Sequence, residues 1–121
     1  MTSIWFLDCL VRDPAPAIAG PAPQGVLEMT APPGSQPPPH VHHDEDEGFY
    51  VLEGEVTLFT SEGETTLRPG EFAVGPRGVP HTFRAGGSGV RMLVISTPAG
   101  FVDFVREFGT PAARERLPAL P

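Results

Sequence analysis

Three of the chain's four histidines fall within four positions, in the segment PPPHVHHDEDEGFYVLEGE at residues 37–55. On an extended strand, residues two apart point to the same side, so His40 and His42 are predicted to face one way and His43 the other. After an acidic turn, Glu47 opens the next predicted strand. Two imidazoles and a carboxylate can therefore converge on one point, and such a group is typical of a metal site.

A fourth ligand should come from a distant strand, and His81 is the remaining histidine. It stands at the start of a predicted strand in GPRGVPHTF. Neutral imidazoles with one carboxylate suit divalent iron, manganese, nickel, copper or zinc better than calcium or magnesium, which prefer all-oxygen ligands. The alternative is a polar loop with solvated histidines. The acidic residues Asp44, Glu45 and Asp46 are predicted to form a solvated turn.

Short strands must position these ligands. Runs of β-prone residues bounded by turn residues recur at intervals of roughly ten, a pattern typical of an antiparallel barrel or sandwich. Gly54 is expected to permit a tight reversal, and ArgProGly at 68–70 has the residues of a type II turn. The predicted strands cover residues 4–11, 25–31, a segment that begins near His40, 47–53, 55–60, 71–74, 80–84 and 90–96.

The pattern changes near the C-terminus, where apolar residues follow helical spacing. In GFVDFVREFG, Phe101, Phe104, Val105 and Phe108 form one stripe, which predicts a helix packed on the barrel or on a partner chain. Pro111 suits the start of a second short helix. We therefore expect a single domain over residues 1–121, with a helical segment at about 99–117.

Composition narrows the classes of partner. The formal net charge is −7, and the eight basic residues are all arginines, so nucleic acid and anionic membranes are disfavoured. No apolar run approaches the ~18 residues needed to span a bilayer, and the N-terminus lacks the basic region of a signal peptide. The single cysteine, Cys9, is expected to be buried in the core and fits a reducing compartment. A cytoplasmic location is predicted.

Two longer segments resemble the characteristic motifs of the cupin family. Residues 34–54 match the first motif: a glycine, five residues, HxH, three or four residues, a glutamate, six residues and a glycine. Residues 70–85 resemble the second, a glycine, five residues, PxG, two residues and a histidine, although Ala85 replaces a frequent asparagine. The ends of the chain are similar to small single-domain cupins related to quercetin 2,3-dioxygenase.

The resemblance implies a double-stranded β-helix, or jelly-roll barrel, with one or two short C-terminal helices. It also implies that one metal ion per chain is held by His40, His42, Glu47 and His81. Four protein ligands leave one or two positions open on a five- or six-coordinate ion, which favours a reactive site. In quercetin-dioxygenase-like cupins the glutamate can also accept the substrate's hydroxyl proton, a catalytic role that Glu47 would inherit.

Strand parity predicts that the remaining inward positions are apolar and suit a flat small molecule, such as an aromatic polyol or polyketide-like phenol. The inward residues are expected to be Leu27, Met29, Phe49, Val51, Val56, Leu58, Phe83, Met92 and Val94, of which Met29, Phe49, Val51, Phe83 and Met92 are the candidate pocket. Tyr50 is expected to point outward. Arg84 and Arg91 are interpreted as surface residues, although either could orient an anionic group.

Several functions remain open. Without lysine there is no Schiff base, and no serine or cysteine lies beside a spare histidine for a catalytic triad. The favoured hypothesis is a metal-dependent oxygenase of a small organic molecule. The alternatives are a non-oxidative metallo-cupin, such as an isomerase, cyclase or decarboxylase, and a non-catalytic binding module. A homodimer is predicted because a barrel this small exposes sheet edges, with the N-terminal strand and the phenylalanine helix as the interface.

Overall fold

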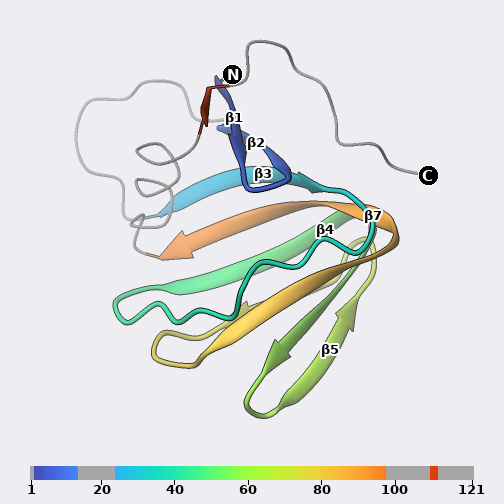
Figure 1. Ribbon diagram of the computed structural model, residues 1–121. Coiled ribbons are helices and arrows are strands. Elements are labelled where there is room, and N and C mark those ends of the chain that lie inside the picture. The colour runs from blue at the N-terminus through green and yellow to red at the C-terminus, as the bar shows by residue number, and fades with distance from the viewer. Residues whose placement is uncertain (1, 14–23, 98–109, 112–121) are drawn as a thin grey trace.

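The structure, a computed structural model, describes residues 2–13, 24–97 and 110–111, and all its regular elements are antiparallel strands (Figure 1). The strands run in the order β5-β4-β7-β3-β2-β1-β8, with β6 also paired to β4. No helix among these residues could cross a membrane. The strands are β1 (Thr2–Phe6), β2 (Cys9–Asp13), β3 (Gly25–Ala31), β4 (Asp46–Thr60), β5 (Gly63–Leu67), β6 (Phe72–Gly75), β7 (His81–Thr97) and β8 (Thr110–Pro111).

Two long strands, β4 and β7, form the centre of the sheet and bend it. The first half of β4 pairs with β6 and with the end of β7, whereas its second half pairs with β5 and with the start of β7. Each long strand therefore contributes to both halves of the fold, as in a jelly-roll barrel (Figure 1). This arrangement brings the first residues of β4 and β7 to the same end of the barrel.

The predicted reversal at Gly54 is wrong. The chain continues as one strand through Gly54, which has a φ of +75°, and the pairing with β7 shifts register on both sides of it. A Cβ at this position would overlap the backbone of Gly89 on β7. Gly54 therefore allows two strands to approach closely at a bulge, which bends β4 rather than ending it. The predicted strands 80–84 and 90–96 are likewise the two ends of continuous β7.

The N-terminal prediction is also wrong in part. Residues 4–11 were expected to form one strand, but the chain reverses at Leu7 and Asp8, and β1 pairs with β2 from Thr2↔Asp13 to Phe6↔Cys9. Leu7 has a φ of +56°, which a two-residue hairpin turn can require and leucine rarely adopts. The predicted burial of Cys9 is confirmed.

Other connections follow the sequence prediction more closely. In the turn at 68–70, Gly70 has a φ of +86° and the Glu71 amide donates to the Arg68 carbonyl, as in a type II turn. The strand expected near His40 is reduced to a single bridge with His81. The predicted helical segment at 99–117 lies outside the described residues, except Thr110 and Pro111, which form β8 and are extended.

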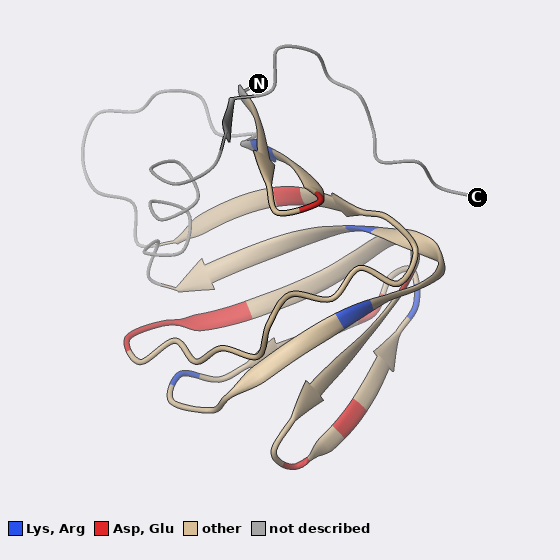
Figure 2. Ribbon diagram, viewed as in Figure 1, with Lys and Arg blue, Asp and Glu red and all other residues tan. Residues whose placement is uncertain are grey.

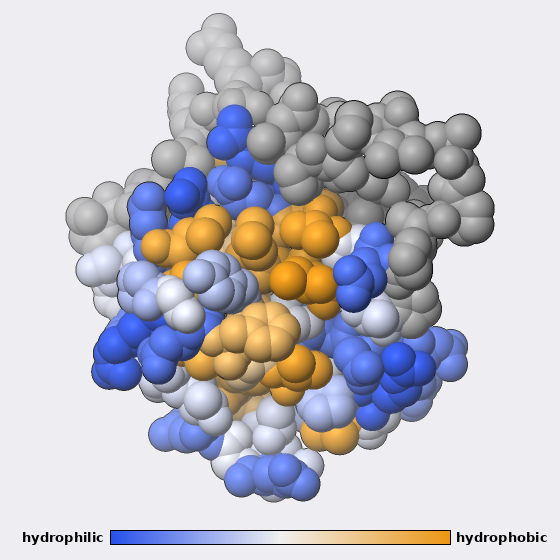
Figure 3. All heavy atoms as spheres, turned by 180° about the vertical axis from the view of Figure 1, so that it is seen from behind, coloured by the Kyte–Doolittle hydropathy of each residue, from blue (hydrophilic) through white to orange (hydrophobic). Residues whose placement is uncertain are grey.

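The barrel interior is apolar, as strand parity predicts. All nine residues expected to point inward are buried. On the outer face, Tyr50 is 37% exposed and pairs with exposed Phe72, while Val74 pairs with Gly48. A hydrophobic area flanked by hydrophilic residues is visible on the face shown in Figure 3. β1, expected to offer a free edge for a dimer, is paired with β8 at Ile4 and Trp5, and dimerisation stays a prediction.

Candidate metal centre

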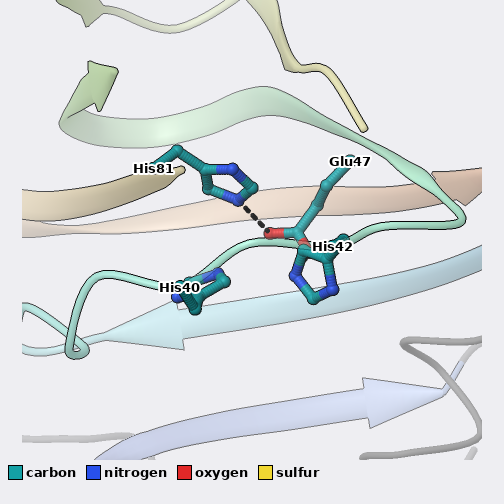
Figure 4. A group of neighbouring side chains, drawn as sticks. All are labelled: His40, His42, Glu47 and His81. Carbon is teal, nitrogen blue, oxygen red and sulfur yellow. Dashed lines mark ion pairs between the residues drawn. The ribbon is translucent and has the colours of Figure 1, made fainter. Parts of the chain in front are cut away.

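The four predicted ligands converge at one end of the barrel (Figure 4). His40 stands at the isolated bridge, His42 in the loop that follows, Glu47 near the start of β4 and His81 at the start of β7. Their candidate donor atoms all lie within 4.8 Å of one another. Glu47 and His81 lie at opposite ends of the β4–β7 pairing, where Glu47 is opposite Ser96 and His81 is opposite Thr60. They meet because the bent sheet closes on itself, so that Gly75, opposite Glu47 on β6, lies against the His81 ring.

Backbone hydrogen bonds fix the segments that carry these side chains. The amides of His40 and His81 each donate to the other's carbonyl, at 3.0 and 2.8 Å. The Gly78 amide donates to the His42 carbonyl at 2.8 Å, which joins the two ligand-bearing loops. At Gly75, opposite Glu47 in the β4–β6 pairing, a Cβ would lie 3.0 Å from the His81 ring, so glycine leaves room for the imidazole.

The hydrogen bonds at Nδ1 define the tautomers of His40 and His81. The Nδ1 of His40 lies 2.9 Å from the Pro38 carbonyl, and the Nδ1 of His81 lies 3.2 Å from the Val79 carbonyl. Because a carbonyl can only accept, each Nδ1 must carry the hydrogen, and each neutral ring then keeps its lone pair on Nε2. These contacts prepare the Nε2 atoms of both rings as ligands.

His42 is held between two carboxylates. Its Nε2 lies 3.0 Å from Oε2 of Glu47, and its Nδ1 lies 3.0 Å from Oε1 of Glu45. The prediction that Glu45 lies in a solvated turn is wrong, since Glu45 is only 9% exposed. The sequence signal for this contact was that Glu45 follows His42 by three positions, a separation at which a short loop can bring two side chains together. Glu45 orients the ring from behind, as carboxylates do for metal-binding histidines.

The buried Glu47 side chain lies beside the imidazoles of His42 and His81. Burial alone would raise the pKa of Glu47, but the close contact with His42 and the charge interactions with His42 and His81 outweigh it and lower the pKa to about 2. The hydrogen bond to Glu47 conversely raises the pKa of His42, against the effect of burial. Without a metal, the ionised form of Glu47 and the charged form of His42 therefore stabilise each other.

These residues fit a transition-metal ion. The Nε2 of His81 is buried and has no hydrogen-bond partner among the described residues; Oε1 of Glu47 lies 3.7 Å away (Figure 4). Donor atoms about 2.1 Å from a common ion lie at most about 4.2 Å apart, so the observed spread requires a contraction of about half an ångström. Three imidazoles and one carboxylate also match the donor preference of divalent transition metals.

The neighbouring Asp46 is paired rather than freely solvated. Its carboxylate accepts from the backbone amide of Arg77 at 2.8 Å and from the Arg77 guanidinium at 3.1 Å. Hydrogen bonds from Arg77 lower the pKa of Asp46. This exposed contact ties the start of β4 to the turn that precedes His81, and it thereby connects the two ligand-bearing segments.

A cavity of about 910 Å³ is lined by three of the four ligands, His40, His42 and Glu47. Among the predicted pocket residues, Met29, Phe49 and Phe83 line it, together with Val94. Val51 and Met92, which pair with each other, are fully buried and are not among the lining residues, so this part of the prediction is wrong. Further walls come from the β1–β2 turn and from the proline-rich segment 35–39, which the sequence analysis did not assign to the pocket.

The remaining candidate residues lie outside the metal group. His43 is exposed and is not among the four converging residues, as predicted, but it lines the same cavity as His40 and His42 although strand parity placed it on the opposite side. Arg84 stacks over the Phe59 ring at 5.1 Å, and Arg91 pairs with Glu28 and Glu53. Neither arginine lines the cavity, which supports their interpretation as surface residues.

With this geometry established, comparison with known proteins defines the family. A family model described as "Cupin domain" matches residues 27–97, which include all four candidate ligands. The chain belongs to the cupin family. Among solved structures, an RmlC-like cupin from Shewanella frigidimarina NCIMB 400 superimposes with a TM-score of 0.69, covering 86% of this chain and 89% of the other. At 20% identity, that likeness shows the fold alone.

Two further comparisons have higher sequence identity to this cupin. Quercetin 2,3-dioxygenase of Bacillus subtilis (strain 168) is 31% identical over 96 residues. The match covers 79% of this cupin and 28% of the relative, so the chain spans less than a third of the relative's length. A structure from Thermus thermophilus is 35% identical with a TM-score of 0.59, covering 63% of this chain and 73% of the other.

Proposed function

We propose that this cupin is a metal-dependent oxygenase that binds a flat, largely apolar phenolic or enolic molecule beside the metal. One observation carries the proposal: three imidazoles and a buried carboxylate converge on one point, and three of these four ligands, His40, His42 and Glu47, line a largely apolar cavity of about 910 Å³. A site that only stabilised the fold would need no cavity at its open side. The likeness to a quercetin 2,3-dioxygenase supports the substrate class.

His40, His42, Glu47 and His81 would hold the ion. A bound transition metal supplies a Lewis acid for a substrate oxygen and, when redox-active, a centre for reaction with dioxygen. The chain's own residues must then position an aromatic substrate. Phe49 and Phe83 have ring centroids 6.1 Å apart and both line the cavity, so they offer aromatic surface close to His81.

Glu47 is the group that would receive the substrate's proton. It is 2% exposed, and without a metal its pKa of about 2 keeps it ionised, so Oε1 or Oε2 can accept a hydrogen bond from the substrate's hydroxyl. Transfer of the proton to this weakly basic carboxylate would depend on the metal lowering the pKa of the bound substrate. A phenol or enol that loses its proton there becomes the anion that a metal ion binds more strongly. Cys9 does not compete as a nucleophile, because burial raises the pKa of its thiol to about 12.

The decisive experiment begins with the metal content of untagged protein purified without chelator, by plasma mass spectrometry. Protein loaded with iron, manganese, nickel or copper is then tested for oxygen consumption with 3-hydroxyflavones. We expect near-stoichiometric metal and metal-dependent consumption of oxygen, lost in Glu47→Gln. Turnover of a substrate without oxygen would contradict the oxygenase assignment and favour an isomerase or lyase. Protein that binds no metal after reconstitution would overturn the proposal altogether.

A further inference from the structure

Acidic side chains outnumber arginines among the described residues that line the cavity. These acidic side chains are the carboxylates of Asp8, Asp44, Glu45 and Glu47, and no arginine from the described residues joins them. The described arginines lie on β2, on β7 and in two turns of the barrel (Figure 2). Four of them have carboxylate partners: Arg12, Arg68, Arg77 and Arg91. Among the residues that the structure describes, no arginine is therefore placed to compensate an anionic substituent in the part of the cavity away from the metal ligands.

One of these carboxylates lies apart from the ligand-bearing segments. Asp8 stands in the β1–β2 turn and reaches the loop before His40, where Ser35 donates from Oγ to its Oδ1 at 2.6 Å. Ser35 is buried, whereas Asp8 is exposed and lines the cavity. Asp8 and Ser35 thus form a second polar position in a cavity whose other walls are mostly apolar.

The backbone around Ser35 makes this position rigid. The Ser35 amide donates to the Pro32 carbonyl at 3.1 Å, and its carbonyl accepts from the Ala85 amide at 2.9 Å. The neutral thiol of Cys9 lies 3.5 Å from Oδ1 of Asp8. Both side-chain contacts engage Oδ1, so the carboxylate is oriented by one oxygen while facing the cavity. A preorganised acceptor of this kind rewards a ligand that brings a donor.

We propose that Asp8, oriented by Ser35, determines specificity: the cavity accepts neutral ligands with a hydrogen-bond donor at a second position away from the metal, and rejects anionic substituents there. The inference rests on the proposed function, because a metal-binding oxygen would anchor the other end of the ligand. It narrows the substrate class from flat phenols in general to those with a second hydroxyl or amino group.

The test uses a matched series with one chelating end. The probes are 3-hydroxyflavone, its 4′-hydroxy derivative and its 4′-carboxylate derivative. They are titrated by fluorescence into the full-length protein loaded with Zn²⁺, which is not redox-active and leaves the probe unconsumed. We expect the 4′-hydroxy probe to bind roughly tenfold more tightly than 3-hydroxyflavone and the 4′-carboxylate to bind about tenfold more weakly.

Variants separate specificity from a structural role. Asp8→Asn keeps an oxygen that can accept from Ser35 but removes the charge, so both preferences should shrink to about threefold or less. Glu64→Gln makes the same charge change at an exposed residue of β5 outside the cavity and should leave both unchanged. Ser35→Ala removes the hydrogen bond from Ser35 to Asp8. If this hydrogen bond only stabilised the hairpin, Ser35→Ala and Asp8→Asn would each lower the affinity of all three probes by the same factor.

The outcomes distinguish the role of Asp8 in specificity from the proposed function. Equal affinity for the three probes, or preferences that survive in Asp8→Asn, would overturn the role of Asp8 and leave the proposed function standing. Tightest binding of the 4′-carboxylate would also overturn it. Failure of all three probes to bind the Zn²⁺-loaded protein would refute the aromatic substrate class and the specificity that depends on it.

Discussion

The cavity has two polar regions that are held in place to very different degrees. At the metal centre, each ligand ring has a second contact, and the segments that carry the ligands are joined by backbone hydrogen bonds and by the Asp46–Arg77 pair. At the β1–β2 turn, the contact between Asp8 and Ser35 is the main polar link to the neighbouring loop, and Leu7 beside it is 63% exposed.

The difference assigns separate tasks to the two regions. A metal site requires donor atoms at nearly fixed separations, so redundancy in the supporting contacts preserves affinity. A substrate contact at the hairpin tolerates adjustment, because its purpose is to discriminate between ligands rather than to hold an ion. Substitutions should therefore affect metal binding strongly at the first region and leave it largely unchanged at the second.

The largest effect is expected for His81→Ala. This change removes a buried donor whose Nε2 has no hydrogen-bond partner among the described residues, and the metal affinity should fall at least about 100-fold. His43→Ala, at an exposed neighbouring histidine, is the matched control and should keep full stoichiometry. Metal content after dialysis checks both variants. Equal metal content in the two would contradict the assignment of ligands.

The next largest effect is the pH dependence of metal affinity. In the metal-free centre the His42 pKa lies above its ordinary value, and a metal must displace that proton. The Glu47 pKa of about 2 means that this carboxylate releases no proton on binding between about pH 5 and 8. The affinity should be flat above the His42 pKa and fall about tenfold per pH unit below it. Competition with a chelator at several pH values measures this change in metal affinity. A metal affinity that is unchanged between about pH 8 and 5 would exclude a histidine site.

Glu45→Gln should have a smaller effect than loss of a ligand. Its Oε1 orients His42 through Nδ1, and loss of such a carboxylate typically lowers metal affinity about 10- to 100-fold. Asp44→Asn makes an equal charge change one residue away, at an exposed side chain, and should lower affinity much less. Calorimetric titration with metal distinguishes them. Similar losses in both variants would mean that Glu45 acts only through its overall charge.

The ligand set was predictable from sequence because it needs only residue type, strand parity and motif spacing. Parity selected His40, His42 and Glu47, His81 was the remaining histidine, the motif spacing fits all four, and the structure brings them together. Glu45 was missed because strand periodicity gives no information about a loop in which a side chain folds back on its neighbour. The cavity walls from residues 35–39 were missed for a related reason: their position depends on tertiary contacts such as that between Ser35 and Ala85.

The all-β fold class was predictable from the sequence, but the way in which some strands connect was not. Gly54 looked like a reversal because glycine permits both turns and bulges, and only the approach of Gly89 on a distant part of β7 distinguishes them. The β1–β2 hairpin gave no sequence signal at all. Its turn residues are Leu7 and Asp8 rather than the glycine or asparagine that usually mark a two-residue turn.

That unusual turn gives the smallest predicted effect. Leucine at a φ of +56° costs roughly 1 kcal/mol relative to glycine in the same conformation, whereas glycine loses about 0.5–1 kcal/mol through greater freedom in the unfolded chain. Leu7→Gly should therefore change stability by less than about 1 kcal/mol despite loss of a large side chain.

Leu93→Gly, in β7 with ordinary backbone angles, is the control and should destabilise clearly more, as thermal unfolding can show. Equal destabilisation would mean that the Leu7 side chain contributes packing that offsets its backbone strain. Metal content should be unchanged in Leu7→Gly, because the hairpin supports the substrate end of the cavity and not the ligands.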